Sequence, residues 1–274
     1  MSDLKNSAVQ APVGVFDSGL GGLAVLQELR HLLPHEQFIY CADQANLPYG
    51  QRSLAEVRHF SRQITQFLYQ AHQIKLLVIA CNTASGAALH VLRQECPQLP
   101  FVGIEPAIKP AVAATRSGVV AVLATNATFQ GNLFTKVVNA FAQHVQVLSQ
   151  PAPELVQLVE AGELHSAETL AVLERLLQPL LAQGADTLVL GCTHYGFLKP
   201  AIHALCPHIT IIDPAPAIAR QAHRVLHQNQ LLASGPVMPP PLFFTSAAPD
   251  HFAQQLVRLG WEVAADQVLA APWL

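Results

Sequence analysis

The feature that most constrains this chain is an internal duplication in which each copy carries a cysteine at the same place. The first copy contains LLVIACNT at residues 76–83, and the second contains TLVLGCTH at residues 187–194. The similarity continues downstream, because Cys81 and Cys192 are each followed by a Cys-Pro pair and then by an apolar run that ends in an acidic residue and proline. Two related halves can present two matching thiols to one cleft from opposite sides. Such an arrangement permits chemistry on both faces of a single carbon.

Short apolar runs alternate with helical patterns along both halves. Strands are predicted at residues 13–16, 38–41, 76–80, 101–104, 119–123, 145–148, 188–190, 209–212 and 242–245. Helices are predicted at residues 23–33, 55–69, from 85 to 92, 129–142, 167–183, 217–230 and 251–259, with a Pro-rich loop at 234–241. This alternation predicts an α/β fold of two similar domains, each with a mostly parallel sheet flanked by helices.

The duplicated unit ends near Asp213, so the remaining C-terminal segment is expected to return to the first domain. We therefore predict a discontinuous first domain formed by residues 1–105 plus 214–274. The second domain is predicted to span residues 106–213, with the active site in the cleft between the two domains.

The composition favours a well-packed protein and argues against several kinds of partner. Of the 274 residues, 51% are hydrophobic and 12% are charged, against about 25% charged in typical soluble domains. The net charge of −3 and the scattered Lys and Arg residues make nucleic acid and anionic membranes poor candidate partners. The polar segment at residues 1–13 and the lack of a long apolar stretch predict neither a signal peptide nor a membrane span. Five cysteines, an odd number, suggest free thiols in a reducing cytoplasm.

Polar residues follow several predicted strands at the point where each strand ends. They are Asp17 and Ser18, the turn at residues 48–50, Cys81 with Asn82 and Thr83, and Cys192 with Thr193 and His194. Ligands of α/β sheets bind beyond the carboxyl ends of the strands. The helix N-termini that follow would hold a carboxylate, and we expect them to lower the pKa of a neighbouring thiol from its free value of about 8.5.

We do not expect the same role for all five cysteines. Cys41, Cys96 and Cys206 are interpreted as small buried apolar residues, and the last two precede a proline where a helix should end. The duplication and the polar residues that follow favour a functional role for Cys81 and Cys192. A zinc site is not expected, because the chain has no C-x₂-C pair and the Cys192-x-His194 pair alone is a weak signal.

Two further features leave alternatives open. The turn at residues 19–24 fits G-x-G-x-x-A, and Asp43 ends the next strand, which is the pattern of a dinucleotide-binding site. Asp17 directly before the glycines would repel a pyrophosphate, and the glycines could instead serve a tight turn and close packing. Glu160 is either a solvated surface residue or a partner of the second thiol.

Four motifs, taken together, resemble those of the glutamate racemases, which belong to the cofactor-independent aspartate/glutamate racemase superfamily. They are FDSGLGG (16–22), PYG (48–50), IACNTA (79–84) and LGCTHY (190–195). They occur in the family's order and span residues 13–213. The resemblance implies interconversion of L- and D-glutamate without a cofactor, which supplies D-glutamate for peptidoglycan. It also implies a cytoplasmic enzyme whose partner is a small molecule, and a homodimer is a family-level expectation.

The resemblance also implies roles for individual residues. Cys81 and Cys192 match the two acid/base thiols, Asp17 matches the carboxylate beside the first thiol, and Glu160 and His194 match the groups beside the second. The implied substrate contacts are Asp17, Ser18, Pro48, Tyr49, Gly50, Asn82, Thr83, Thr193 and His194. The chain departs from the family pattern at Gln44 and Ala152, where the family often has Thr and Cys, and keeps a Gly-Thr pair only in part near residues 124–128.

These residues lead to the hypothesis of a two-base racemisation. One cysteine, as a thiolate, removes the α-proton, and the other, as a thiol, returns a proton to the opposite face. Backbone N–H groups with Asn82, Thr83 and Thr193 would hold the substrate carboxylate as charge develops. Three rival hypotheses remain at this point: racemisation of aspartate, a dinucleotide-dependent oxidoreductase, and a non-catalytic module that binds acidic amino acids.

Overall fold

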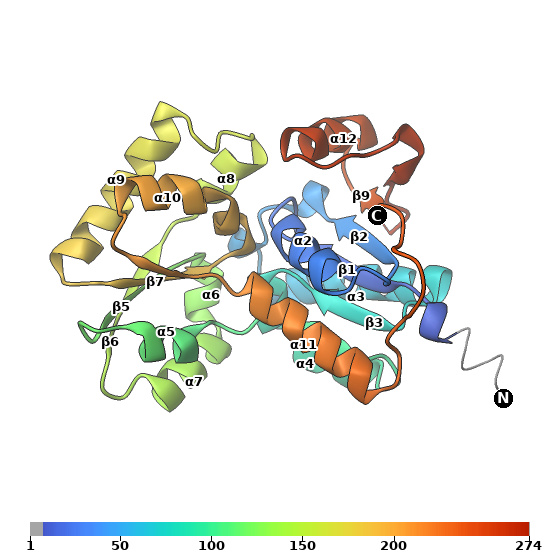
Figure 1. The fold of residues 1–274 in the computed structure, drawn as a ribbon, viewed down its shortest axis with the longest axis horizontal. Helices are drawn as coiled ribbons and strands as arrows, with labels where there is room; N and C mark the ends of the chain where they lie inside the picture. The colour runs from blue at the N-terminus through green and yellow to red at the C-terminus, as the bar shows by residue number, and fades with distance from the viewer. Residues whose placement is uncertain (1–7, 274) are drawn as a thin grey trace.

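The computed structural model describes residues 8–273 and consists of two lobes, each built on its own parallel sheet (Figure 1). The first lobe is defined here by a six-stranded sheet of order β10-β9-β2-β1-β3-β4, and the second lobe by a four-stranded sheet of order β6-β5-β7-β8. All pairings in both sheets are parallel. The predicted two-domain α/β fold is confirmed.

The strands of the first sheet are β1 (Val13–Asp17), β2 (Phe38–Ala42), β3 (Leu76–Ile79), β4 (Phe101–Gly103), β9 (Leu242–Thr245) and β10 (Val268–Ala270). The strands of the second sheet are β5 (Val119–Ala124), β6 (Gln146–Pro151), β7 (Thr187–Gly191) and β8 (Thr210–Ile212). The central strands β1 and β7 are buried along their whole length. This burial explains why their sequences are continuous apolar runs instead of alternating ones.

The helices of the first lobe are α2 (Leu23–Leu32), α3 (Leu54–His72), α4 (Asn82–Glu95), α11 (Ala215–Gln228) and α12 (Pro249–Arg258). The helices of the second lobe are α5 (Ile108–Ala114), α6 (Asn126–Gln130), α7 (Asn132–Phe141), α8 (Glu154–Glu160), α9 (Ala167–Ala182) and α10 (Lys199–Leu205). Four 3₁₀ turns complete the described elements: η1 (Gln44–Asn46), η2 (Tyr49–Gln51), η3 (Thr193–Leu198) and η4 (Ala265–Gln267).

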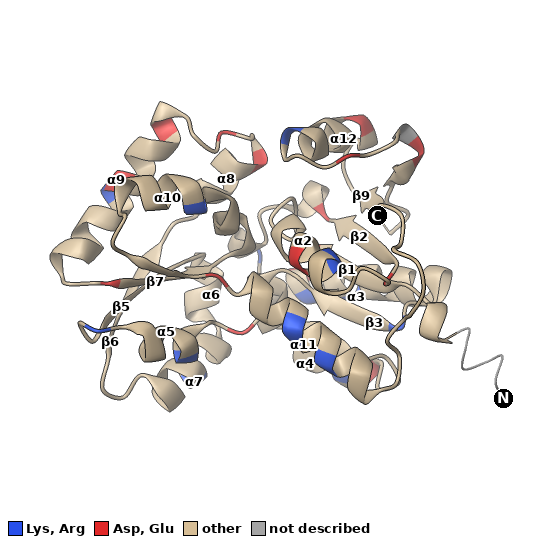
Figure 2. Cartoon of the chain, in the orientation of Figure 1, with Lys and Arg blue, Asp and Glu red and all other residues tan. Residues whose placement is uncertain are grey.

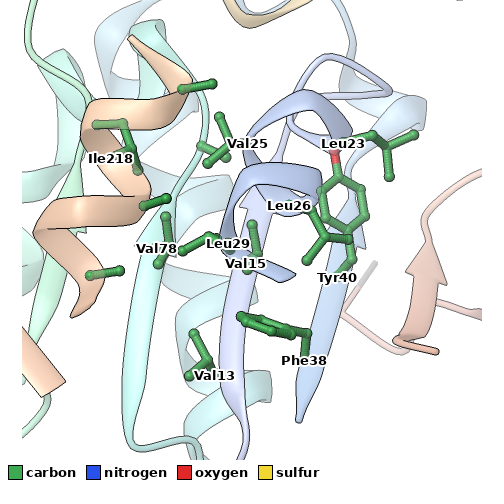
Figure 3. Close-up of a cluster of buried hydrophobic side chains, with 14 of the residues drawn as sticks. Val13, Val15, Leu23, Val25, Leu26, Leu29, Phe38, Tyr40, Val78 and Ile218 are labelled. Carbon is green, nitrogen blue, oxygen red and sulfur yellow. The ribbon is translucent and has the colours of Figure 1, made fainter. Parts of the chain in front are cut away.

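Each sheet buries both of its faces under helices. Successive side chains of a strand point to opposite faces, so Val13 and Val15 of β1 pack under α2 and α11, whereas Phe16 packs under α3 and α4. Figure 3 shows the first of these clusters, with Leu26 and Leu29 of α2 directed onto the strands. In the second lobe, α8, α9 and α10 cover one face, and α5 and α7 cover the other. Because helices cover both faces of each sheet, a ligand can reach the sheet at the carboxyl ends of its strands.

The C-terminal segment packs against the first sheet. Strand β9 pairs with β2, and β10 pairs with β9. In Figure 1, α11 and α12, coloured orange and red, also lie on this side of the molecule, and α11 contributes Ile218 and Ala222 to the core beside α2. On these pairings we propose the domain boundaries expected from the duplication, with residues 1–105 plus 214–274 in one domain and 106–213 in the other.

Several local predictions were wrong in detail. The single helix predicted at residues 129–142 is divided into α6 and α7, because Gly131 is extended (φ −73°, ψ 137°) and caps the second helix. The helix predicted from residue 85 already begins at Asn82. The helices α5, α8 and α10 and the strand β10 were not predicted, since they are at most seven residues long and give little periodicity. The prediction for the N-terminal segment falls largely on residues 1–7, outside the described range.

Charged residues of both signs are distributed over both lobes, as the scattered Lys and Arg residues in the sequence predict (Figure 2). Figure 2 shows Lys and Arg dispersed over elements of both lobes, α5 and α11 among them, with acidic residues interspersed. Within residues 8–273, no helix combines the length and the apolar character needed to cross a bilayer.

All five cysteines are free thiols, and Cys41 and Cys206 are buried as expected. Cys96 is only partly buried, because it caps the end of α4 near the surface.

Candidate functional site

A small cavity lies where the carboxyl ends of the strands in the two lobes face each other. The first lobe lines it with Ser18, Pro48, Tyr49, Gly50, Cys81, Asn82 and Thr83, and the second lobe with Thr125, Val156, Cys192, Thr193 and His194. Ten of the twelve predicted site residues therefore surround one cavity, and Asp17 and Glu160 lie directly behind it, in hydrogen-bond contact with the lining residues Thr193 and His194. The cavity volume is about 20 Å³, close to the space that one water molecule needs. An amino acid can enter only if the lobes separate or the lining side chains move.

The first thiol, Cys81, is placed by the junction of β3 and α4. Its backbone is extended and it caps α4, whose Ala84 N–H lies 3.5 Å from Sγ. The side chain is buried, and Ser18 Oγ lies 4.0 Å from Sγ. Burial, reinforced by the charge of Asp17, raises the pKa of the Cys81 thiol well above its ordinary value. The expected lowering was therefore wrong for Cys81, because the helix N–H acts in that direction but is outweighed by desolvation.

Asp17 sits at the end of β1 with no exposed surface. Its Oδ2 accepts hydrogen bonds from Gly22 N (2.7 Å) and from Thr193 Oγ1 (3.4 Å), which belongs to the other lobe. Its Oδ1 has no hydrogen-bond partner among the described residues. Burial raises the pKa of Asp17, although the positive charge of His194 and two backbone N–H groups act against this. Asp17 thus links the glycine turn to the second lobe and leaves one acceptor unpaired in the interior.

The second thiol, Cys192, begins a relay of three polar side chains. Its Sγ lies 3.6 Å from His194 Nδ1, and His194 Nε2 lies 2.6 Å from Glu160 Oε1. Only 2% of the His194 side chain and 12% of the Glu160 side chain are exposed, so Glu160 is a partner of the second thiol's histidine and not a solvated surface residue. In this arrangement His194 can exchange a proton with Cys192 at one ring nitrogen while Glu160 fixes the other.

The pKa shifts of His194 and Glu160 both favour the charged forms of this buried pair. Burial by itself lowers the pKa of His194, but hydrogen bonds and charge from Cys192 and Glu160 outweigh it and raise that pKa well above its ordinary value. Burial likewise raises the pKa of Glu160, and the contacts with His194, Leu20 N–H and Gln44 outweigh it and lower that pKa. The directions for the two partners agree, so a buried imidazolium faces a buried carboxylate.

We expect this ion pair to make stability depend on pH. The raised pKa of His194 contributes stability that is complete below its ordinary value of 6.5 and is lost as pH rises through the folded-state pKa. The lowered pKa of Glu160 contributes stability that is complete above 4.5 and is lost as pH falls through the folded-state pKa. A His194→Gln variant should lose about 3 kcal/mol of unfolding free energy near pH 6, where the pair is intact, and less at pH 9. Urea unfolding at both pH values measures this, and an equal loss at both would contradict it.

The glycine turn holds carboxylates of the chain itself. Leu20 N–H donates to Glu160 Oε1 and Gly22 N–H donates to Asp17 Oδ2, both at 2.7 Å. A Cβ added to Gly21 would lie 2.5 Å from Thr193 Oγ1 and 2.6 Å from His194 Nδ1. The glycines therefore allow the first lobe to approach the polar groups of the second. A pyrophosphate at this turn would have to displace both carboxylates, which weighs against the dinucleotide-binding alternative.

Tyr49 and Asn82, which also line the cavity, differ in whether their polar atoms are already hydrogen-bonded. Tyr49 is buried, and its O–H donates to Asp43 Oδ2 at 2.6 Å, so that hydroxyl is already engaged. Asn82 Oδ1, in contrast, has no partner among the described residues and is free to accept from a ligand. Within residues 8–273 there is no cluster of three or more His, Cys, Asp or Glu side chains that could hold a metal ion.

Thr125 and Val156 were missed by the sequence analysis. Thr125 follows β5 at its carboxyl end, caps α6, and has its Oγ1 3.3 Å from Thr83 Oγ1 across the lobe boundary. A polar residue at the end of a buried strand is one of the two signals that singled out Cys81 and Cys192, the other being the internal duplication. Val156 lies on the short helix α8, and no local pattern distinguishes it from a core residue.

Comparison with known proteins places this chain and its two-lobed fold in one class. Residues 19–222 match the model of the Asp/Glu/Hydantoin racemase family, and the chain belongs to that family. It is 51% identical over 256 residues to the glutamate racemase of Pseudomonas paraeruginosa, covering 93% of this chain and 96% of that protein. The resemblance expected from the four motifs is thus confirmed, and so is the prediction of an amino-acid racemase.

Solved structures support the same assignment. The glutamate racemase of Escherichia coli, in complex with L-glutamate and the activator UDP-MurNAc-Ala, is 33% identical with a TM-score of 0.82, covering 95% of this chain and 97% of that one. The glutamate racemase of Francisella tularensis, in complex with D-glutamate, is 28% identical with a TM-score of 0.83, covering 97% and 98%. Two proteins similar to this chain therefore bind opposite enantiomers of the same amino acid.

Proposed function

We propose that this protein interconverts L- and D-glutamate by proton transfer at Cα, with Cys81 and Cys192 as the two acid/base groups. The observation that carries the proposal is that both cysteines line one cavity, each from the end of a strand in a different lobe. The similar proteins with bound L-glutamate and bound D-glutamate support glutamate as the substrate. Homology over nearly the whole chain supports the same reaction class.

The proposed reaction needs one proton donor and one proton acceptor at the same time. Cys81 rests as a thiol, since burial raises its pKa, and it can return a proton to the carbanion. Cys192, with His194 as its proton partner, removes the α-proton on the other face. Removal from one face and return to the other inverts the stereocentre, and the reverse reaction exchanges the two roles. A single base would tend to return the proton to the face that it left.

Charge that develops on the substrate carboxylate requires donors that are already in place. The first turn of α4 offers backbone N–H groups directly beside Cys81. Asn82, Thr83 and Thr193 add side-chain donors on both sides of the cavity. We assign these groups to the substrate carboxylate, and the unpaired oxygens of Asn82 and Asp17 to the substrate ammonium group.

We further propose that the reaction takes place in the cytoplasm, where free thiols persist, and that its product D-glutamate is used for peptidoglycan. The homodimer expected from the resemblance stays a prediction.

A chirally resolved assay in D₂O tests the proposed function. We expect L-glutamate to be converted to an equal mixture of both enantiomers, with deuterium incorporated at Cα of the product, because the returned proton comes from a solvent-exchanged thiol. Aspartate in the same assay serves as the substrate control and should turn over far more slowly. Lack of α-deuterium in the product would exclude proton abstraction. Faster turnover of aspartate would favour the rival substrate.

A further inference from the structure

We propose that Gln44 and Gln255 are positioning residues that hold Glu160, and through it His194, in place beside Cys192. This inference rests on the proposed function and assigns a task to two residues that lie outside the substrate cavity. Gln44 is one of the positions where the chain departs from the family pattern. Both side chains come from the first lobe, whereas Glu160 ends α8 of the second lobe.

Glu160 is held from several directions. Its Oε1 accepts from His194 Nε2 and from Leu20 N–H. Its Oε2 accepts from Gln44 Nε2 at 3.1 Å, the one hydrogen bond that this oxygen makes within the described part of the chain. Gln255 Nε2 donates to the backbone carbonyl of Glu160 at 2.8 Å. Gln44 thus fixes the rotation of the carboxylate, and Gln255 fixes the backbone that carries it.

The hydrogen bonds that join Thr245, Gln44, Gln255 and Glu160 form one network. The backbone carbonyl of Glu160 determines the direction of each of them. The carbonyl oxygen of Glu160 can only accept, so the amide nitrogen of Gln255 must face it and Oε1 of Gln255 must accept. Gln44 Nε2 then gives one hydrogen to Gln255 Oε1 at 2.8 Å and the other to Glu160. Gln44 Oε1 in turn accepts from Thr245 Oγ1 at 3.0 Å. Reversing either amide would set acceptor against acceptor, so the network has one arrangement.

The positions of these residues explain why they act through Glu160. Gln44 lies in η1, Thr245 ends β9 and Gln255 lies on α12, and none of them lines the cavity. Gln255 and Thr245 are buried, and Gln44 is partly buried. The network crosses the lobe boundary, so it assembles only when the lobes are closed. The first lobe therefore supports the Cys192 relay of the second lobe through Glu160.

Methionine variants of similar volume remove the amides with little change in packing. In Gln44→Met and Gln255→Met, we expect kcat to fall by about tenfold, because the first variant loses the hydrogen bond to the charged carboxylate of Glu160 and the second leaves the buried backbone carbonyl of Glu160 without its donor. KM should stay near the wild-type value, since neither residue touches the cavity. Gln254→Met is the matched control, because Gln254 is the exposed neighbour of Gln255 on α12. Gln44→Glu keeps the shape but lacks the donors, and should lose at least as much activity as Gln44→Met.

Two readouts separate positioning from a general loosening of the fold. With α-deuterated substrates, the isotope effect on kcat/KM should increase for the enantiomer that is deprotonated by Cys192 and remain unchanged for the other. In ¹⁵N NMR, the pKa of His194 should move down toward its ordinary value in both methionine variants, because a mobile carboxylate stabilises the imidazolium less.

The proposal is overturned if both methionine variants keep the wild-type kcat and His194 titration, or if both isotope effects change equally. The titration needs no turnover, so it tests the positioning role even if the wild-type protein fails to racemise glutamate. That failure would count against the proposed function alone.

Discussion

Replacing either Cys81 or Cys192 with serine should lower the racemisation rate by about 10²- to 10⁴-fold, the contribution of one positioned acid/base group. A serine hydroxyl is a far weaker acid than a thiol, so it neither supplies a ready anion nor matches the basicity of the remaining cysteine. Since the two thiols line the same cavity from opposite lobes, loss of either one interrupts proton transfer in both directions. The measurement is kcat/KM for L- and D-glutamate by chirally resolved chromatography.

Cys96→Ser is the matched control for these variants. Cys96 ends α4, is only partly buried, and lies outside the cavity, so its substitution should leave kcat/KM unchanged. Retention of full activity by either Cys81→Ser or Cys192→Ser would remove the two-thiol mechanism. Loss of activity in both, with unchanged circular dichroism, would support it.

Gly21→Ala should abolish most activity while leaving the fold largely intact. An added Cβ would lie 2.5–2.7 Å from Thr193 Oγ1 and from two atoms of His194, well inside van der Waals contact. The two lobes can relieve this clash by moving apart, which separates Cys81 from Cys192 without unfolding either core. A misplacement of about 1 Å can cost about 10²-fold in rate, whereas overpacking costs about 1–3 kcal/mol of stability. We expect the kcat/KM loss to reach at least about 10²-fold, measured alongside the free energy of unfolding.

Gly86→Ala provides the comparison for the glycine substitution. Gly86 lies on the exposed face of α4, and an added Cβ there would meet nothing within 4 Å. Alanine within a helix is more stable than glycine by about 0.5–1 kcal/mol, so this variant should be slightly stabilised and fully active. Wild-type activity in Gly21→Ala would show that close approach of the lobes is not needed for turnover.

The two thiols lie in different electrostatic environments, because different charged groups surround them. Cys81 has a buried carboxylate, Asp17, on its side, and both burial and that charge favour its protonated form. Cys192 has an imidazole on its side, and the imidazole is held by a second carboxylate. Two similar cysteines in a duplicated chain are thus given different environments by residues that the duplication does not repeat. Such an asymmetry suits a reaction in which one group gives a proton while the other takes one.

Local sequence patterns predicted much of the fold and of the site. The buried strands are continuous apolar runs, and a polar residue directly after such a strand marks the open edge of a parallel sheet. Together with the internal duplication, that rule singled out Cys81 and Cys192, and the rule also applies to Thr125, for which no site role was predicted. The short helices α5, α8 and α10 were not predicted, because seven residues complete about two turns and present little periodic pattern.

The amino-acid sequence by itself determined the alternation of strands and helices, the duplicated cysteines and the motifs that define the family. Only the tertiary structure decided that Glu160 contacts His194, that the glycine turn holds carboxylates instead of a pyrophosphate, and that Gln255 reaches Glu160 from 95 residues away. It also decided that burial and the charge of Asp17 raise the pKa of the Cys81 thiol. The physical reason is that strand and helix formation depends on neighbours along the chain. Desolvation and contacts between lobes depend on groups that are distant in sequence and meet only when both sheets are packed.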